Sequence, residues 1–128
     1  MDIWKMEKQV IRCGIVGSRS ILDKEYVFSV LDFYLRRLLE EYEVAIISGG
    51  AIGIDTLGAQ WSKTKGLKTE VYLPDYKQHG KSATFIRNQT IVDNSDYLIA
   101  ITTGSNGTAD SIKRANKKGI VTRVIKCI

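Results

Sequence analysis

The strongest structural signal in this chain of 128 residues is the stretch Val44-Ala45-Ile46-Ile47-Ser48-Gly49-Gly50-Ala51-Ile52-Gly53-Ile54-Asp55. Its apolar start, Val44–Ile47, predicts a short strand, and the segment that follows the glycines, Ile54–Lys65, has the apolar spacing of a helix. A strand that ends in glycines before a helix leaves backbone N–H groups free at the helix start, and these donors favour an anion such as phosphate. The stretch therefore predicts a strand–turn–helix unit with an anion site at its turn.

Two further turns of the same kind follow apolar runs, at Gly17-Ser18-Arg19-Ser20 and at Thr103-Gly104-Ser105-Asn106-Gly107-Thr108-Ala109-Asp110. One glycine turn is weak evidence, because glycine also serves simply to bend the chain. Three turns at the same structural position favour a nucleotide-like ligand. The stretch Ser48–Asp55 contains a G-x-x-x-G in place of the dinucleotide fingerprint G-x-G-x-x-G, and the full P-loop pattern G-x-x-x-x-G-K-[ST] does not occur in the chain.

Apolar runs and helical patterns alternate along the rest of the chain. The remaining predicted strands and helices are Val10–Val16, Lys24–Tyr42, Glu70–Leu73, Ala83–Val92, Tyr97–Ile101, Thr108–Lys118 and Ile120–Ile125, with a polar loop at Asp75–Ser82. Alternation of this kind implies a parallel sheet covered on both faces. We expect one α/β domain over residues 1–128, a Rossmann-like three-layer sandwich whose five-stranded parallel sheet has the order 3-2-1-4-5. In that order the three glycine turns converge on one crevice.

Composition argues against several classes of protein. No segment approaches the roughly 18–20 uninterrupted apolar residues of a membrane span. Met1–Gln9 lacks the apolar core of a secretory signal, so a cytoplasmic location is expected. Cys13 and Cys127 lie in apolar runs and are expected to behave as small buried hydrophobes. With His79 as its single histidine, the chain offers no metal-ligand spacing, and we expect neither a metal nor a cofactor.

The net charge of +5 is moderately basic. Clusters of lysine, for example Lys63 and Lys65 or Lys113 and Lys117, could attract nucleic acid, but they are also typical of solvated helix faces. The aromatic residues fall mostly on stripes that face a core, rather than on a surface for base stacking. We therefore expect weak or no binding of nucleic acid, and no membrane partner.

Several side chains near the turns suit a phosphate or a ribose. Arg19 can fork onto phosphate oxygens, and Arg87 lies in a helix that begins at the predicted crevice. Asp55 either binds a ribose hydroxyl or stabilises the N-terminal end of its own helix dipole. If Thr108 caps the last helix, Asp110 lies in its first turn, where it faces the ligand or stabilises the dipole. The predicted ligand-binding residues are Gly17, Ser18, Arg19, Ser48, Gly49, Gly50, Gly53, Asp55, Asn88, Gly104, Ser105, Gly107 and Thr108, and the catalytic candidates are Arg87 and Asp110.

Taken together, these motifs resemble the SLOG superfamily, a Rossmann-like group that includes the Lonely Guy phosphoribohydrolases and the DNA-processing protein of natural transformation. Ile15-Val16-Gly17-Ser18-Arg19 is similar to the first turn of the family, and Ser48-Gly49-Gly50-Ala51 with Gly53-Ile54-Asp55 is similar to its second. Tyr76, Gly80-Lys81 and Ile86-Arg87-Asn88 resemble the small stand-alone branch, whose members are common in bacteria and their phages. The resemblance implies a nucleotide-binding domain and a homodimer.

The last glycine turn departs from the Lonely Guy pattern P-G-G-x-G-T-x-x-E, whose glutamate works with an arginine to cleave the N-glycosidic bond of a nucleoside monophosphate. Gly107-Thr108 is kept, but alignment on that pair places Ser111 at the glutamate position and Asp110 one residue earlier. The DNA-processing proteins share the Gly-Ser-Arg and Gly-Ile-Asp elements, yet their second motif continues with an alanine-histidine step where this chain has Leu57-Gly58-Ala59. The resemblance therefore leaves the activity open.

Three functions are considered. The first is binding or sensing of a nucleotide or of a nucleotide-derived, ADP-ribose-like ligand. The second is hydrolysis of a nucleoside 5′-monophosphate, in which Arg87 and Asp110 face each other across the ligand: Arg87 positions the phosphate or ribose, and Asp110 stabilises oxocarbenium-like charge or activates water. The third is binding of single-stranded DNA. Trp4, Tyr34 and Trp61 are candidates for exposed anchors in a homo-oligomer.

Overall fold

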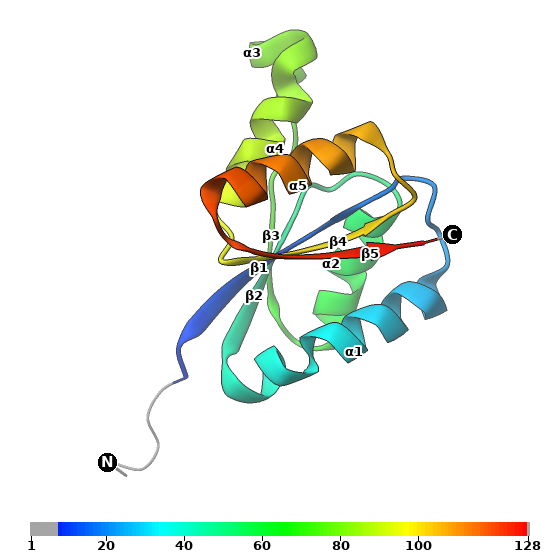
Figure 1. Cartoon of the computed structure of the whole chain (residues 1–128), viewed down its shortest axis with the longest axis vertical. Helices are drawn as coiled ribbons and strands as arrows, with labels where there is room; N and C mark the ends of the chain where they lie inside the picture. The colour runs from blue at the N-terminus through cyan, green and yellow to red at the C-terminus, as the bar shows by residue number, and fades with distance from the viewer. Residues whose placement is uncertain (1–7, 128) are drawn as a thin grey trace.

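The computed structural model describes residues 8–127, which form a parallel sheet between two layers of helices (Figure 1). The strands are β1 (Val10–Gly17), β2 (Glu43–Ser48), β3 (Lys68–Val71), β4 (Tyr97–Thr102) and β5 (Val121–Lys126). The helices are α1 (Lys24–Glu41), α2 (Ile54–Thr64), α3 (Tyr76–His79), α4 (Ala83–Asp93) and α5 (Asn106–Lys118), with a 3-10 turn, η1 (Gly80–Ser82), between α3 and α4. No helix in this part of the chain is both long enough and apolar enough to cross a membrane.

The sheet has the order β3-β2-β1-β4-β5, and all neighbouring strands are parallel. This confirms the predicted α/β, Rossmann-like architecture. Strand β1 lies at the centre, where Gly14 is opposite Ile47 of β2 and Leu98 of β4. Gly17, the last residue of β1, is opposite Ile101 of β4. The two strands therefore end side by side and lead to helices on opposite faces, which is the switch point at which open α/β sheets bind ligands.

Figure 1 shows α1 and α2 on one face of the sheet and α4 and α5 on the other. Alternate strand residues supply the two cores, as the period of two along a strand requires. In β1, Cys13 and Ile15 pack with α1 and α2, whereas Val16 packs with α4 and α5. The buried residues of α1 are Val27, Leu31 and Leu35, at the predicted helical spacing.

The segment Asp75–Ser82 was predicted as a polar loop, but it forms α3 and η1. The side chain of Asp75 caps α3 by accepting a hydrogen bond from the Gln78 amide at 3.1 Å. A short polar helix has no apolar periodicity, so the sequence pattern could not predict it. In Figure 1, α3 projects away from the sheet beyond the start of α4.

Helix α5 begins at Asn106, so the predicted cap at Thr108 is wrong. The cap is Ser105, whose backbone is extended (φ −65°, ψ 147°) and whose carbonyl oxygen accepts a hydrogen bond from the Ala109 amide at 3.0 Å. The hydroxyl oxygens of Thr108 and Ser105 lie 2.8 Å apart, so Thr108 is bonded within the first turn. Asp110 consequently lies past the first turn of the helix, where the dipole has less effect.

Trp61 is fully buried in the core under α1 and α2, so the prediction of an exposed anchor is wrong for this residue. Its indole N–H donates a hydrogen bond to Oδ1 of Asp32 at 2.9 Å, which satisfies the buried polar atom. Tyr34 is partly buried against the same core, and Trp4 lies outside the described residues. Of the three candidate anchors, the structure therefore rules out Trp61.

Candidate functional site

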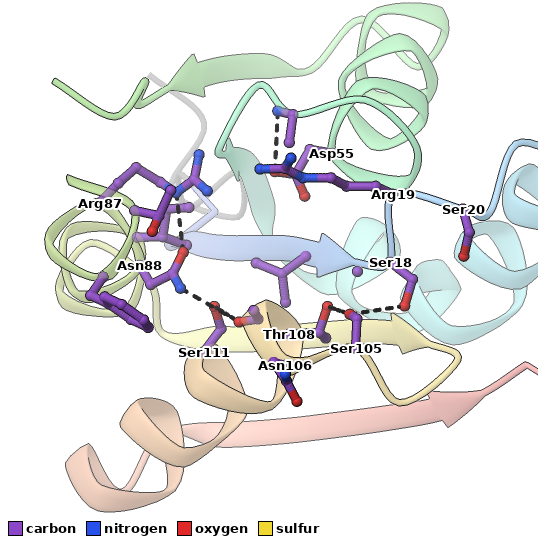
Figure 2. Close-up of a pocket in the computed structure, with 17 residues that line it drawn as sticks. Ser18, Arg19, Ser20, Asp55, Arg87, Asn88, Ser105, Asn106, Thr108 and Ser111 are labelled. Atoms are coloured by element: carbon purple, nitrogen blue, oxygen red, sulfur yellow. Dashed lines mark hydrogen bonds between the residues drawn. The ribbon is translucent and has the colours of Figure 1, made fainter. Parts of the chain in front are cut away.

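A pocket of about 540 Å³ opens at the carboxyl ends of β1 and β4 (Figure 2). This volume lies in the range of small-molecule sites. Four parts of the chain supply the lining: the turn after β1, the start of α2, one side of α4, and the start of α5. The pocket therefore lies at the switch point that the strand order defines.

Ser18 ties the ends of β1 and β4 together at this pocket. Its buried hydroxyl oxygen accepts hydrogen bonds from the backbone N–H of Thr103 at 2.9 Å and from the Thr103 hydroxyl at 3.1 Å. It also lies 3.3 Å from Oγ1 of Thr102 and 3.1 Å from Oγ of Ser105. The hydroxyl of Ser18 is thus engaged by the protein itself, and it fixes the start of α5 relative to β1.

Two glycines allow the turn after β1 to touch the start of α2. A Cβ atom at Gly17 would collide with the carbonyl oxygen of Ile101 and would lie 2.5 Å from the Ile54 side chain. Gly53 has a φ of 82°, and a Cβ atom there would lie 2.6 Å from the Ser18 carbonyl oxygen. Backbone atoms cannot move aside as a flexible side chain can, so both positions require glycine for packing.

Ser48 and Gly50 shape the loop that leads into α2. The buried hydroxyl of Ser48 donates to the carbonyl oxygen of Asp55 at 3.0 Å and accepts from the Gly50 amide at 3.3 Å. Gly50 has a φ of 73°, and a Cβ atom there would lie 2.5 Å from a terminal methyl of Leu73. Neither Ser48 nor Gly50 lines the main pocket, so both contribute to it by holding the loop in shape.

Arg87 reaches the pocket from α4 and is held at two points. Its Nη1 donates to the carbonyl oxygen of Gly49 at 2.6 Å, and its Nε donates to Oδ1 of Asn88 at 3.1 Å. The residue is 9% exposed. A guanidinium group has five N–H donors, so these two bonds leave others for a ligand. Arg87 is therefore a preorganised cation in the wall of the pocket.

Asn88 connects Arg87 to α5. Its Nδ2 donates to Oδ2 of Asp110 at 3.0 Å, and the same carboxylate oxygen accepts from Nε of Arg114 at 2.8 Å. Nη1 of Arg114 also donates to Oε1 of Gln89 at 2.9 Å. Asp110 does not line the pocket, so the structure does not bring Arg87 and Asp110 face to face across it. Asn88 instead joins the two side chains on one side of the pocket.

Asp55 is the one carboxylate among the residues that line the pocket. It is 6% exposed, and its Oδ2 accepts a hydrogen bond from the Ala51 amide at 3.3 Å. Burial raises the pKa of Asp55 to about 6, although the charge of Arg87, the bond from Ala51 and the charge of Arg19 act in the opposite direction. Figure 2 shows Arg19 extending from the turn after β1 toward Asp55. With two arginines and one carboxylate, the lining is net positive.

The first turn of α5 opens onto the pocket through Asn106, Gly107 and Thr108. In the described chain no side chain accepts a capping hydrogen bond at this N-terminus. A Cβ atom at Gly107 would meet no described atom within 4 Å outside its chain neighbours and its own helix backbone, so the space beside the helix start is open. The Gly107 carbonyl oxygen accepts hydrogen bonds from Nδ2 of Asn88 and Oγ of Ser111, on the side that leads away from the N-terminus. Uncovered amides at a helix start, aligned with the helix dipole, favour an anion.

The structure gathers most of the predicted site residues around this pocket. The predicted residues that line it are Gly17, Ser18, Arg19, Asp55, Arg87, Asn88, Ser105, Gly107 and Thr108. The predicted residues that do not line it are Ser48, Gly49, Gly50, Gly53, Gly104 and Asp110. Of these, Gly49 and Gly50 line a smaller pocket beside it.

Other lining residues were not predicted as ligand contacts. Thr84 and Ile91, which were not predicted, recur with the predicted Asn88 at intervals of four and three along α4, so that side of the helix faces the pocket together with Phe85. Phe85 lies in the predicted helix Ala83–Val92 but was not singled out, because helical periodicity does not show whether an apolar side chain contacts the core or a ligand. Ser111 also lines the pocket, and its alignment with the Lonely Guy glutamate was the available signal.

A parallel sheet of this order, with a pocket at its switch point, defines a Rossmann-like α/β protein. The chain belongs to the YAcAr family, the YspA, cpYpsA-related SLOG family, whose sequence model matches residues 11–79. This match confirms the resemblance to the SLOG superfamily. The matched segment runs from β1 to α3 and contains the first two glycine turns, but it does not reach the turn between β4 and α5.

The X-ray structure of TM1055, a Northeast Structural Genomics Consortium target, has a similar fold. The two chains are 20% identical and have a TM-score of 0.62, over 90% of this chain and 72% of that chain. At this level of identity, the similarity concerns the fold alone. No curated protein matches the sequence.

Proposed function

We propose that the main pocket binds a nucleotide or a nucleotide-derived ligand and does not cleave it. The observation that carries the proposal is the meeting of three positive features at one pocket: the open start of α5, Arg19 and Arg87. A helix N-terminus and an arginine fork each favour a phosphate. Membership of the SLOG family supports the same class of ligand.

The remaining side chains of the pocket suit the other parts of a nucleotide. Phe85 is 49% exposed and offers its ring as a stacking surface for a base. Asp55 offers a carboxylate oxygen that can accept hydrogen bonds from ribose hydroxyls. The volume of about 540 Å³ lies within the range of small-molecule sites. Phosphate, ribose and base thus each have a chemically matched partner.

Hydrolysis of the N-glycosidic bond is less well supported. Ser111 lines the pocket at the position aligned with the Lonely Guy glutamate, and a hydroxyl group does not supply the charge of a carboxylate. Asp110 is bonded to Asn88 and Arg114 outside the lining. Both observations favour binding over turnover.

The proposal is tested by native mass spectrometry of the purified protein and by calorimetry with AMP, GMP, CMP and UMP. Gly107→Leu fills the open space at the start of α5, whereas Ala109→Leu adds the same side chain at an exposed position that does not line the pocket. We expect Gly107→Leu to weaken binding of the best nucleotide by about tenfold or more, and Ala109→Leu to leave it unchanged.

Three results would count against the proposal. Folded wild-type protein that binds none of the nucleotides would overturn it, and so would equal affinities of the two leucine variants. Chromatography of the incubated mixture detects any free base. Release of free base from the bound nucleotide over several hours would show that the protein is a hydrolase and not only a binding protein.

A further inference from the structure

A second hollow, of about 330 Å³, adjoins the main pocket next to the loop between β2 and α2. Arg19, Ala51 and Arg87 belong to the linings of both. The two hollows therefore meet at these residues, and their common boundary contains both arginines of the site. The second hollow plays no part in the function proposed above.

The boundary carries more positive charge than the protein neutralises, because the two arginines face one carboxylate, Asp55, in the linings of the two hollows. Within residues 8–127, neither Arg19 nor Arg87 takes part in a salt bridge. Arg87 donates to a carbonyl oxygen and to an amide oxygen, which are neutral acceptors. Asp55 bonds to the Ala51 amide and not to a guanidinium group. An anion at the boundary would thus find two cations with unused N–H donors.

Each hollow also has an exposed aromatic ring. Phe85 lines the main pocket and is 49% exposed, and Tyr76 lines the second hollow and is 56% exposed. Leu73 and Ile52, at 70% and 67% exposure, add apolar surface beside Tyr76. Clustered exposed apolar side chains mark binding surfaces. The site is therefore cationic in the middle and apolar at both ends.

From this arrangement we infer that the ligand has two ring-bearing halves joined by a diphosphate. The nucleoside half lies in the main pocket, the diphosphate spans Arg19 and Arg87, and a second ring, a sugar or a base, packs on Tyr76 in the second hollow. The inference rests on the proposed function and narrows its ligand to one chemical class. A nucleoside monophosphate would occupy the main pocket and leave Tyr76 without a partner.

The test compares, by calorimetry, each monophosphate with a diphosphate-bridged compound of the same base: AMP with ADP-ribose, GMP with GDP-mannose, and UMP with UDP-glucose. We expect one bridged compound to bind about tenfold or more tighter than its monophosphate. Tyr76→Ala should remove most of that gain and leave the monophosphate affinity unchanged. Phe33→Ala is the matched control, because Phe33 is also 56% exposed but lies on α1, away from both hollows.

The possible outcomes separate this inference from the proposed function. If a monophosphate binds as tightly as its bridged partner, and Tyr76→Ala affects neither, the inference fails while the main pocket remains a nucleotide site. If Tyr76→Ala changes the oligomeric state measured by light scattering but no affinity, the second hollow is a protein interface and the inference also fails. If folded protein binds none of the six compounds and does not bind CMP, both proposals fall together.

Discussion

The turn between β2 and α2 and the turn between β4 and α5 look alike in sequence, but their glycines are there for different reasons. In the first turn, a Cβ atom at Gly49, Gly50 or Gly53 would come within 2.7 Å of another atom. In the second turn, a Cβ atom at Gly107 meets no described atom within 4 Å. The first turn is closed by packing and the second is open to the pocket. A glycine-rich turn can therefore offer its backbone to a phosphate only where packing does not fill the space beside its glycines.

The largest effect is expected at the closed turn. Gly53→Ala places a Cβ atom 2.6 Å from the Ser18 carbonyl oxygen, at a residue whose φ is 82°. Strain in the left-handed region and an immovable backbone neighbour together cost about 3 kcal/mol of unfolding free energy. Urea unfolding followed by circular dichroism measures this cost. A loss below about 1 kcal/mol would mean that the two turns do not differ as described.

Asp55, in the first turn of α2 directly after the closed turn, gives an electrostatic test. Its pKa of about 6 in the folded protein lies above the ordinary value of 3.8, so the folded state binds more protons than the unfolded state between these pH values. Stability therefore falls as the pH rises from 4 to 6, by about 2–3 kcal/mol, and stays lower above pH 6. Asp55→Asn should remove this fall and make the protein more stable than wild type at pH 8.

The measurement for Asp55 is urea unfolding of wild type and variant at pH 4, 5, 6 and 8. Glu41→Gln, which removes an exposed carboxylate at the end of α1, serves as the control for general charge effects. Parallel stability profiles of wild type and Asp55→Asn would show that burial of this carboxylate has no energetic consequence.

A smaller effect is expected from Asp110, which lies on α5 but outside the open turn. Asp110→Asn weakens the partly exposed ion pair with Arg114, which costs about 0.5 kcal/mol, and keeps a side-chain oxygen as acceptor for Asn88. Nucleotide affinity should change less than about threefold. A loss of free-base release by two orders of magnitude, with affinity unchanged, would instead restore Asp110 as a catalytic residue.

The smallest effect on stability is expected at the open turn. Gly107→Ala adds a methyl group where no described atom is near, in a helix that prefers alanine to glycine. The unfolding free energy should stay within about 0.5 kcal/mol of wild type or rise slightly. Urea unfolding beside Gly53→Ala gives a direct comparison of the two turns. Destabilisation equal to that of Gly53→Ala would remove the distinction between them.

The fold was predictable from the sequence because alternating strands and helices, joined by right-handed crossovers, leave few sheet orders. The start of α5 was misplaced, since Ser105 and Thr108 are both suitable caps and only the packed helix distinguishes them. The place of Asp110 depends on the rotation of α5 about its axis. Thr108, Ser111 and Ala115 are the buried residues of α5, and this leaves Asp110 to pair with Asn88 of α4.

The sequence predicted where the glycine-rich turns lie better than it predicted what each glycine does in its turn. The sequence predicts Gly17 and Gly53 as ligand contacts, but their lack of a side chain is required by the approach of two loops that are far apart in the chain. Such an approach depends on the packed structure and leaves no local signal. The role of the Ser18 hydroxyl could not be predicted from the sequence for the same reason. Its bonds to Thr103 and Ser105 join the end of β1 to the turn that follows β4.

The open space at the start of α5 has an evolutionary consequence. Asn106 and Gly107 line the pocket and are exposed. Under the proposed function, substitutions at these two residues can change the ligand that is bound while costing little of the free energy of unfolding, which most mutations lower. The closed turn between β2 and α2 does not tolerate such substitutions, because its loops can approach each other only where glycine has no side chain. Ligand preference can therefore diverge through residues 106 and 107 while the fold stays the same. A combinatorial library at these two positions is an efficient way to change the ligand preference of the pocket.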